Sequence, residues 1–145
     1  HVLPSSVGRL TEEARRFGAD LVIVHGETLT EPVAEGTNKA AIEAGADILA
    51  HPGLISAELC RLAAKKGVYL EITTRKGHSL SNGYVAKTAF ENGASLVINN
   101  DFHAPGDAVS AEQAEKILLG AGLNTLQAAE VFENNKKLFL SKLGG

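Results

Sequence analysis

The sequence predicts an α/β protein with parallel strands, corresponding to part of a (β/α) barrel. In four segments a helix ends at a glycine and a short apolar run follows; the glycines are Gly18, Gly45, Gly67 and Gly93. Glycine is favoured just past a helix because it adopts a left-handed backbone at no steric cost. The apolar runs are continuous, which is typical of strands buried on both faces of a parallel sheet. A complete barrel needs about 250 residues, so we expect 145 residues to be a fragment with about four βα units.

Helices and strands are expected to alternate in the first part of the chain. We predict helices over 5–17, 37–44, 56–66 and 81–92, and strands over 21–25, 48–51, 68–71 and 95–101. Ser56 is a good N-cap, because its hydroxyl can accept a hydrogen bond from the first turn of its helix. An open doubly wound sheet is the alternative to a barrel, although the sequence has no Gly-x-Gly-x-x-Gly turn for a dinucleotide.

Residues 110–145 are expected to form a helical tail on a single domain, 1–145. Ser110 opens one predicted helix, Asn124 caps a second that ends near residue 133, and Asn134 begins a third. This tail would cover an end of the sheet or barrel. Missing barrel strands would expose sheet edges, which favours a homo-oligomer or a missing N-terminal segment as the completing partner.

Composition narrows the classes of function. The net charge is −3, which argues against nucleic acid as a partner, because nucleic-acid binders usually carry a basic excess. The single cysteine, Cys60, excludes a disulfide framework and favours a reducing, cytoplasmic compartment. No apolar run reaches the roughly 18 residues of a membrane span.

Polar side chains end the predicted strands, at His25, His51, Glu71 and Asp101, with His103 two residues later. The carboxyl ends of parallel strands form one face, which carries the active site in such folds. Imidazole and carboxylate ligands together suit Zn, Mn or Fe. We therefore predict His25, His51, Asp101 and His103 as metal ligands. Glu71 would orient a ligand, or it would form a plain salt bridge.

Other polar residues follow the same strand ends. Arg75, Lys76 and His78 come after the third strand and are predicted to bind phosphate, since guanidinium and phosphate pair in a bidentate way. An ordinary exposed basic loop is the alternative. Glu27 would orient His25 or accept a proton, unless it is a solvated loop carboxylate. The sequence offers no Ser/His/Asp triad at a nucleophile elbow, so metal-assisted hydrolysis accounts better for these residues.

The phrases LVIVHGET, DILAHPG, LEITTRKGHSLSNG and VINNDFHAPGD, spread over residues 1–109, resemble the PHP family of polymerase and histidinol-phosphatase metallohydrolases. The resemblance implies a distorted β7α7 barrel with up to three Zn, Mn or Fe ions. It matches His25, His51, Asp101 and His103 to the family's ligands, and Arg75 and His78 to a phosphate-binding rim. The family's opening histidines and bridging glutamate have no counterpart here.

The main hypothesis is a metal-dependent phosphoesterase of histidinol-phosphatase type. In this enzyme a metal-bound hydroxide would attack a phosphomonoester or phosphodiester of a small molecule, and His103 or His78 would help the leaving group. Two alternatives stay open. One is a non-catalytic barrel of the same ancestry that acts as a scaffold or RNA-associated subunit, and the other is a metal-dependent amidohydrolase.

Overall fold

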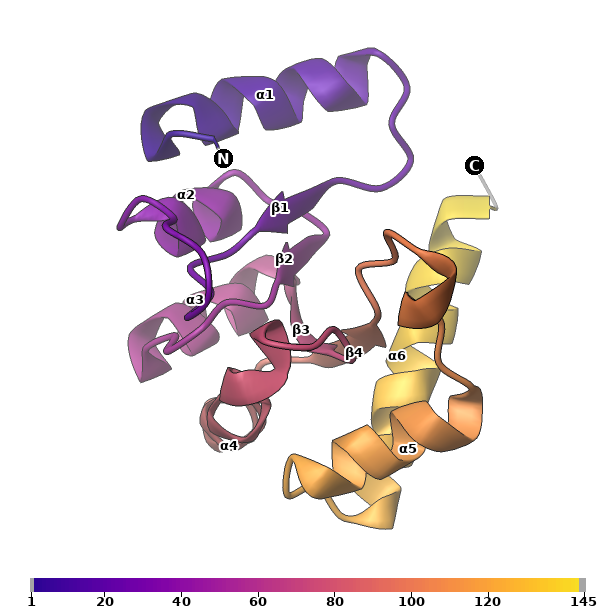
Figure 1. The fold of residues 1–145 in the computed structure, drawn as a ribbon. Coiled ribbons are helices and arrows are strands. Elements are labelled where there is room, and N and C mark those ends of the chain that lie inside the picture. The colour runs from indigo at the N-terminus through magenta and orange to yellow at the C-terminus, as the bar shows by residue number, and fades with distance from the viewer. Residues whose placement is uncertain (1, 144–145) are drawn as a thin grey trace.

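In the computed structural model, which describes residues 2–143, four parallel strands form one sheet flanked by helices (Figure 1). The strands are β1 (Ile23–His25), β2 (Ile48–Ala50), β3 (Tyr69–Thr73) and β4 (Leu96–Asn99). The α-helices are α1 (Pro4–Arg16), α2 (Thr37–Glu43), α3 (Ala57–Lys66), α4 (Asn82–Glu91), α5 (Ala111–Gly120) and α6 (Thr125–Leu143). Two short 3-10 helices are η1 (His78–Ser81) and η2 (Pro105–Asp107).

The predicted α/β class, the parallel sheet and the four βα units are confirmed, whereas a barrel of PHP type is not shown. The strand order is β1-β2-β3-β4, and within the described residues β1 and β4 are the two edges of an open sheet. Four strands are too few to close on themselves, since small barrels have about eight. The successive helices α1, α2, α3 and α4 pack in sequence order, and α6 packs on β4.

The predicted helices agree with α1 to α4 to within one residue at each end. Each of the four glycines that end these repeats has a positive φ, between 70° and 88°. The Ser56 hydroxyl accepts a hydrogen bond from the Leu59 amide at 3.2 Å, as expected of an N-cap. β1, β2 and β4 are shorter than predicted, since residues such as Leu21 precede β1 without belonging to it, whereas β3 runs two residues further than predicted, to Thr73.

The tail differs from the prediction at Asn134, where α6 continues instead of breaking. Asn134 Nδ2 donates to the Leu96 carbonyl oxygen at 3.0 Å. Asn135 Oδ1 accepts from the Ile98 amide at 2.8 Å, and its Nδ2 donates to the Ile98 carbonyl oxygen at 2.9 Å. Side-chain amides therefore take the place of a neighbouring strand along the edge of β4, which would otherwise present unpaired backbone groups.

The core lies between the sheet and the helices on it. Leu49, Leu70 and Ile72 of the middle strands are fully buried, as are Ile42 of α2 and Cys60 of α3. Cys60 is a core residue, and burial raises the pKa of its thiol to about 11 although the nearby Arg61 lowers it.

No helix in the described part of the chain is long and apolar enough to cross a membrane. The cytoplasmic location stays a prediction.

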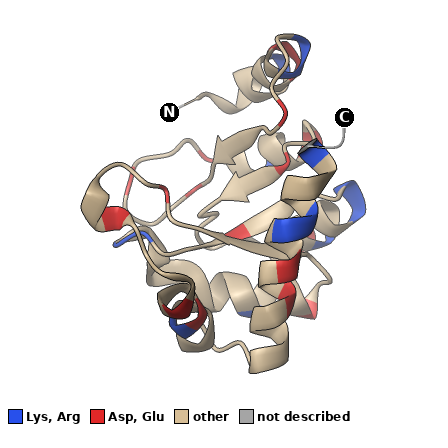
Figure 2. Ribbon diagram, turned by 90° about the vertical axis from the view of Figure 1, so that its right-hand side faces the viewer, with Lys and Arg blue, Asp and Glu red and all other residues tan. Residues whose placement is uncertain are grey.

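Asp47 joins three elements that are far apart in the sequence. Its carboxylate accepts hydrogen bonds from Arg15 of α1 at 2.9 Å and from the Val22 amide at 2.7 Å. Lys142 of α6 lies 2.7 Å from its other oxygen. Burial alone would raise the pKa of Asp47, but Lys142, Val22 and Arg15 together lower it below its ordinary value. Elsewhere acidic and basic positions are spread over several elements (Figure 2).

We predict that Asp47→Asn lowers the free energy of unfolding by about 2 kcal/mol at pH 7, since hydrogen bonds to a charged group are lost. Because the pKa of Asp47 is lowered on folding, its contribution is full above the unfolded value near 3.8 and is lost as the pH falls through the folded pKa. The difference between the two proteins in urea unfolding should therefore shrink in acid. Glu13→Gln, which removes an exposed pair with Arg9, should change stability by less than about 0.5 kcal/mol. An equal loss for Asp47→Asn at pH 7 and in strong acid would contradict this role.

Candidate functional site

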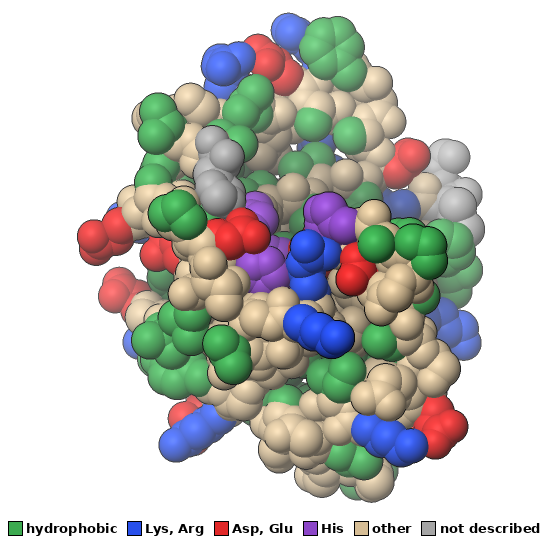
Figure 3. All heavy atoms as spheres, in the orientation of Figure 1, with side chains coloured by type: hydrophobic (Ala, Val, Ile, Leu, Met, Phe, Trp, Pro, Cys, Tyr) green, Lys and Arg blue, Asp and Glu red, His purple; other side chains and the backbone are tan. Residues whose placement is uncertain are grey.

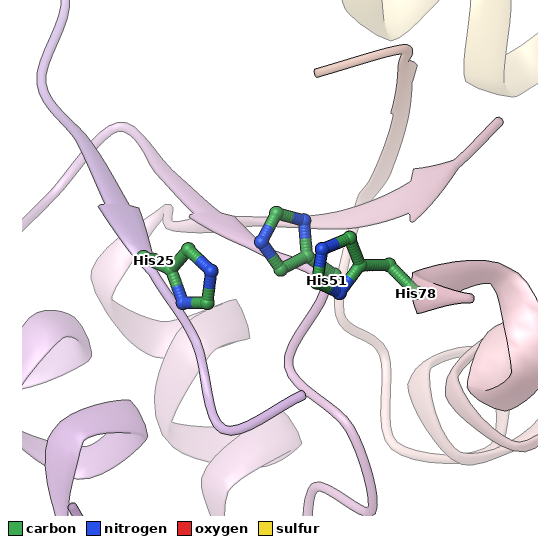
Figure 4. A group of neighbouring side chains, drawn as sticks. All are labelled: His25, His51 and His78. Atoms are coloured by element: carbon green, nitrogen blue, oxygen red, sulfur yellow. The ribbon is translucent and has the colours of Figure 1, made fainter. Parts of the chain in front are cut away.

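Three histidines meet at the carboxyl edge of the sheet and form the histidine cluster, which consists of His25, His51 and His78 (Figure 4). His25 ends β1, His51 follows β2 directly, and His78 begins η1 after β3. The His51 and His78 rings are stacked with centroids 4.3 Å apart, and the His25 ring meets the His51 ring edge-on at 4.4 Å. One ring nitrogen from each lies within 4.8 Å of the other two. The side chains gather near the middle of the face in Figure 3, beside acidic and basic groups.

Each ring is held through its Nδ1 atom by a different group. His51 Nδ1 lies 2.9 Å from Glu71 Oε2, and the same oxygen accepts from the His51 amide at 2.9 Å. His78 Nδ1 lies 2.6 Å from the Thr28 hydroxyl and 3.0 Å from that of Thr30. His25 Nδ1 lies 3.0 Å from the Gly26 carbonyl oxygen. The other ring nitrogen, Nε2, takes no part in these contacts.

Glu31 lies beside the cluster on the loop after β1. Its two carboxylate oxygens are 3.3 Å from His25 Nε2 and 3.4 Å from His78 Nε2. Burial, together with repulsion from His51 and His25, lowers the pKa of His78, although the Glu31 and Asp101 carboxylates raise it. His78 is consequently biased towards the neutral imidazole at neutral pH, which can accept a hydrogen bond or a cation at one nitrogen.

Close approach of two loops places His25 next to His51. A Cβ added to Gly26 would lie 2.5 Å from the Ala50 carbonyl oxygen, and a Cβ on Gly53 would collide with the Glu27 carbonyl oxygen. Asn38 ties the loops together, since its Oδ1 accepts from the Glu27 amide and its Nδ2 donates to the Pro52 carbonyl oxygen at 2.8 Å. The His51 backbone itself has φ of 31°, in the left-handed region.

The structure brings His25 and His51 together with His78, and leaves Asp101 and His103 outside the cluster. Asp101 Oδ2 is 3.2 Å from Arg75 Nε, and the Asp101 carbonyl oxygen accepts from Arg75 Nη1 at 2.8 Å. Arg75 also contacts His103 Nδ1 at 2.7 Å. The four predicted ligands, His25, His51, Asp101 and His103, are thus not brought together, and the Asp101 carboxylate is paired with the Arg75 guanidinium instead.

The remaining predicted residues have other neighbours. The Glu27 carboxylate accepts from the Asn38 amide at 2.8 Å, so it holds the start of α2 and not the His25 ring. Lys76 is exposed. Arg75 forms ion pairs with Asp101 and with Asp107, whose Oδ2 lies 3.6 Å from Arg75 Nη1. Phosphate binding by Arg75, Lys76 and His78 stays a prediction, as do the catalytic roles of His103 and His78.

Sequence reasoning missed the loop residues that support the cluster, which are Thr28, Thr30 and Glu31. A signal was present, because residues two apart in an extended segment lie on the same side. Thr28 and Thr30 both reach His78 in this way.

No family model matches the chain. It is 42% identical over 144 residues to an uncharacterized protein of Methanocaldococcus jannaschii, a match that covers 99% of this chain and 66% of that protein. A chain in a cryo-EM structure of archaeal ribonuclease P with mature tRNA has the same fold, with a TM-score of 0.74 and 21% identity. That match covers 92% of this chain and 63% of the other. The chain therefore spans slightly less than two thirds of the length of each protein.

These comparisons correct three expectations. The resemblance to the PHP family is wrong, because the similarity found is to the archaeal protein and to the ribonuclease P chain. The assignment as a histidinol-phosphatase-like hydrolase acting on a phosphorylated small molecule depended on that resemblance and fails with it.

The argument against nucleic acid as a partner is also wrong, since this fold occurs in a protein solved together with tRNA. Net charge misled because it averages over the whole surface, whereas nucleic-acid contacts are local. Enzymatic activity and a bound divalent ion stay predictions.

We predict that Gly53→Ala lowers the free energy of unfolding by more than about 3 kcal/mol, because φ is +64° and the new Cβ meets the Glu27 backbone. Gly8→Ala is the matched control, since Gly8 lies inside α1 with nothing within 4 Å of an added Cβ. That change should raise stability by about 0.5–1 kcal/mol. Urea unfolding of both variants measures the two effects, and a near-neutral Gly53→Ala would show that the loops are not locked together as described.

Proposed function

We propose that this chain is a non-catalytic, RNA-associated subunit of an assembly of the ribonuclease P kind. The observation that carries the proposal is the similarity in fold to a chain of archaeal ribonuclease P with mature tRNA, with a TM-score of 0.74 over 92% of this chain. This is the alternative that the sequence left open beside the phosphoesterase, and it removes the need for an assembled four-ligand hydrolase centre.

The proposed RNA contact is a rim surface formed by Lys76, Phe102 and His103. Phe102 is 56% exposed, and Lys76 and His103 are exposed as well. Arg75 links the two loops, since its guanidinium contacts the Asp101 carbonyl oxygen and the His103 ring. An exposed aromatic ring can stack on an unpaired base, and a neighbouring lysine can contact phosphate. The rim surface thus combines the two kinds of contact that single-stranded RNA requires.

Fluorescence anisotropy with a labelled tRNA transcript tests the proposal. We expect saturable binding that weakens as salt rises, because phosphate contacts release counterions. Phe102→Ala should weaken binding roughly tenfold through the loss of one stacked base. Lys76→Glu should weaken binding and reduce the slope of log affinity against log salt by about one.

The matched controls lie where helices lead into the amino ends of strands, away from the carboxyl ends that carry the rim surface. Phe17 follows α1 and is 81% exposed, and Lys65 is exposed at the end of α3. Phe17→Ala and Lys65→Glu should leave tRNA affinity within about twofold, since neither residue belongs to the rim surface. Absence of tRNA binding, or equal losses in the control variants, would contradict RNA binding by this surface. Turnover of p-nitrophenyl phosphate by the chain with Zn²⁺ or Mn²⁺ would contradict the non-catalytic part.

A further inference from the structure

We propose that His25, His51 and His78 bind one divalent transition-metal ion through their Nε2 atoms. Ring nitrogens of all three lie within 4.8 Å of one another; His25 and His51 come from the ends of β1 and β2, and His78 comes from η1 after β3. The stacked His51 and His78 rings would have to rotate out of parallel for both Nε2 atoms to point at one ion. Neutral imidazole is a ligand that Zn, Fe and Ni all accept. This ligand set differs from the one that the sequence predicted, because His78 takes part and Asp101 and His103 do not.

The contacts at Nδ1 of the three histidines are those expected of metal-binding histidines. Histidines that bind a metal usually donate the other ring N–H to a carboxylate, a backbone carbonyl or a water molecule, which fixes the tautomer. His51 has the Glu71 carboxylate at 2.9 Å, and His25 has the Gly26 carbonyl oxygen at 3.0 Å. His78 has the hydroxyls of Thr28 and Thr30. In each ring the ion would then bind at Nε2, the nitrogen opposite these contacts.

The buried Nε2 of His51 is the second, independent observation. His51 is 3% exposed, and its Nε2 has no hydrogen-bond partner in the structure. Buried polar atoms are nearly always paired, so an unpaired one points to a partner such as a water molecule or an ion. A water molecule could satisfy one nitrogen, but it would not account for three rings arranged around the same point.

Charge at the centre also favours a cation. The Glu31 carboxylate lies 3.3 Å from His25 Nε2 and 3.4 Å from His78 Nε2, so a negative group already faces the position that the ion would take. Glu31 can complete a four-ligand set of three nitrogens and one oxygen, which is a common arrangement for zinc. Cys60 is buried in the core and its thiol keeps its proton, so we expect no sulfur ligand.

Zinc binding by the full chain, prepared without a polyhistidine tag and stripped of metal, tests the site. Isothermal titration with Zn²⁺ should give one ion per chain. His78→Ala should weaken binding more than roughly tenfold through loss of a ligand, and Glu71→Gln should weaken it roughly 10- to 100-fold through loss of the group that orients His51. Circular dichroism checks that each variant keeps its fold.

His103→Ala is the matched control, because His103 is an exposed histidine on the same face that lies outside the cluster. Its zinc affinity should stay within about twofold of the parent chain. X-ray absorption of the zinc-loaded parent, which needs no variant, should show nitrogen and oxygen neighbours at about 2.0–2.1 Å and no sulfur at about 2.3 Å. Less than one zinc per chain, a sulfur neighbour, or equal losses for His103→Ala and His78→Ala would each overturn the proposal. The outcome can be distinguished from that of the tRNA experiment, because Lys76→Glu and Phe102→Ala leave the histidine cluster unchanged and His78→Ala leaves the rim surface unchanged; His103→Ala is a control for zinc affinity alone.

Discussion

The parallel pairing of β1, β2 and β3 sets where each member of the histidine cluster lies. His25 pairs with Ala50, so His51 stands one residue beyond its neighbour on the same edge. Leu49 pairs with Leu70, which places Glu71 under the start of the loop that carries His51. A shift of one residue would turn these side chains to the other face of the sheet. The buried contact between His51 and Glu71 thus depends on the same register that buries Leu49 and Leu70 in the core.

The two edge strands of the sheet, β1 and β4, have different neighbours. Asn134 and Asn135 of α6 satisfy backbone groups of β4, so this edge has partners without a further strand. At the other edge β1 contains Ile23, which is 53% exposed, and an apolar groove runs between β1 and α1. Asp47 holds α1, the start of β1 and α6 through one carboxylate, and it thereby ties both edges of the sheet into one body.

Local sequence patterns predicted the helices α1 to α4 well, because the residues that begin and end a helix act on backbone groups only a few positions away. The glycines after the helices and the cap at Ser56 act through neighbouring backbone groups, and both were found where expected. Asn134 was misread as a helix start because its partner, Leu96, is distant in the sequence. The contact between His25 and His51 could be predicted, because both residues stand at the carboxyl ends of adjacent parallel strands. The place of His78 required the path of the loop after β3, which no short-range pattern encodes.

Arg75 accounts both for the separation of Asp101 and His103 from the histidine cluster and for the character of the rim surface. A guanidinium has five donors in a rigid plane, and here it spans the Asp101 carboxylate, the Asp101 carbonyl oxygen and the His103 ring. The Asp101 carboxylate is therefore paired with Arg75 and lies outside the cluster, and its φ of 46° fits a chain bent back towards Arg75. The same contacts hold the loop after β4 beside the loop after β3, and these two loops carry the exposed residues Lys76 and Phe102. One arginine thus separates a buried imidazole site from an exposed surface suited to RNA, so the two proposed sites can coexist on one edge of the sheet without sharing a residue.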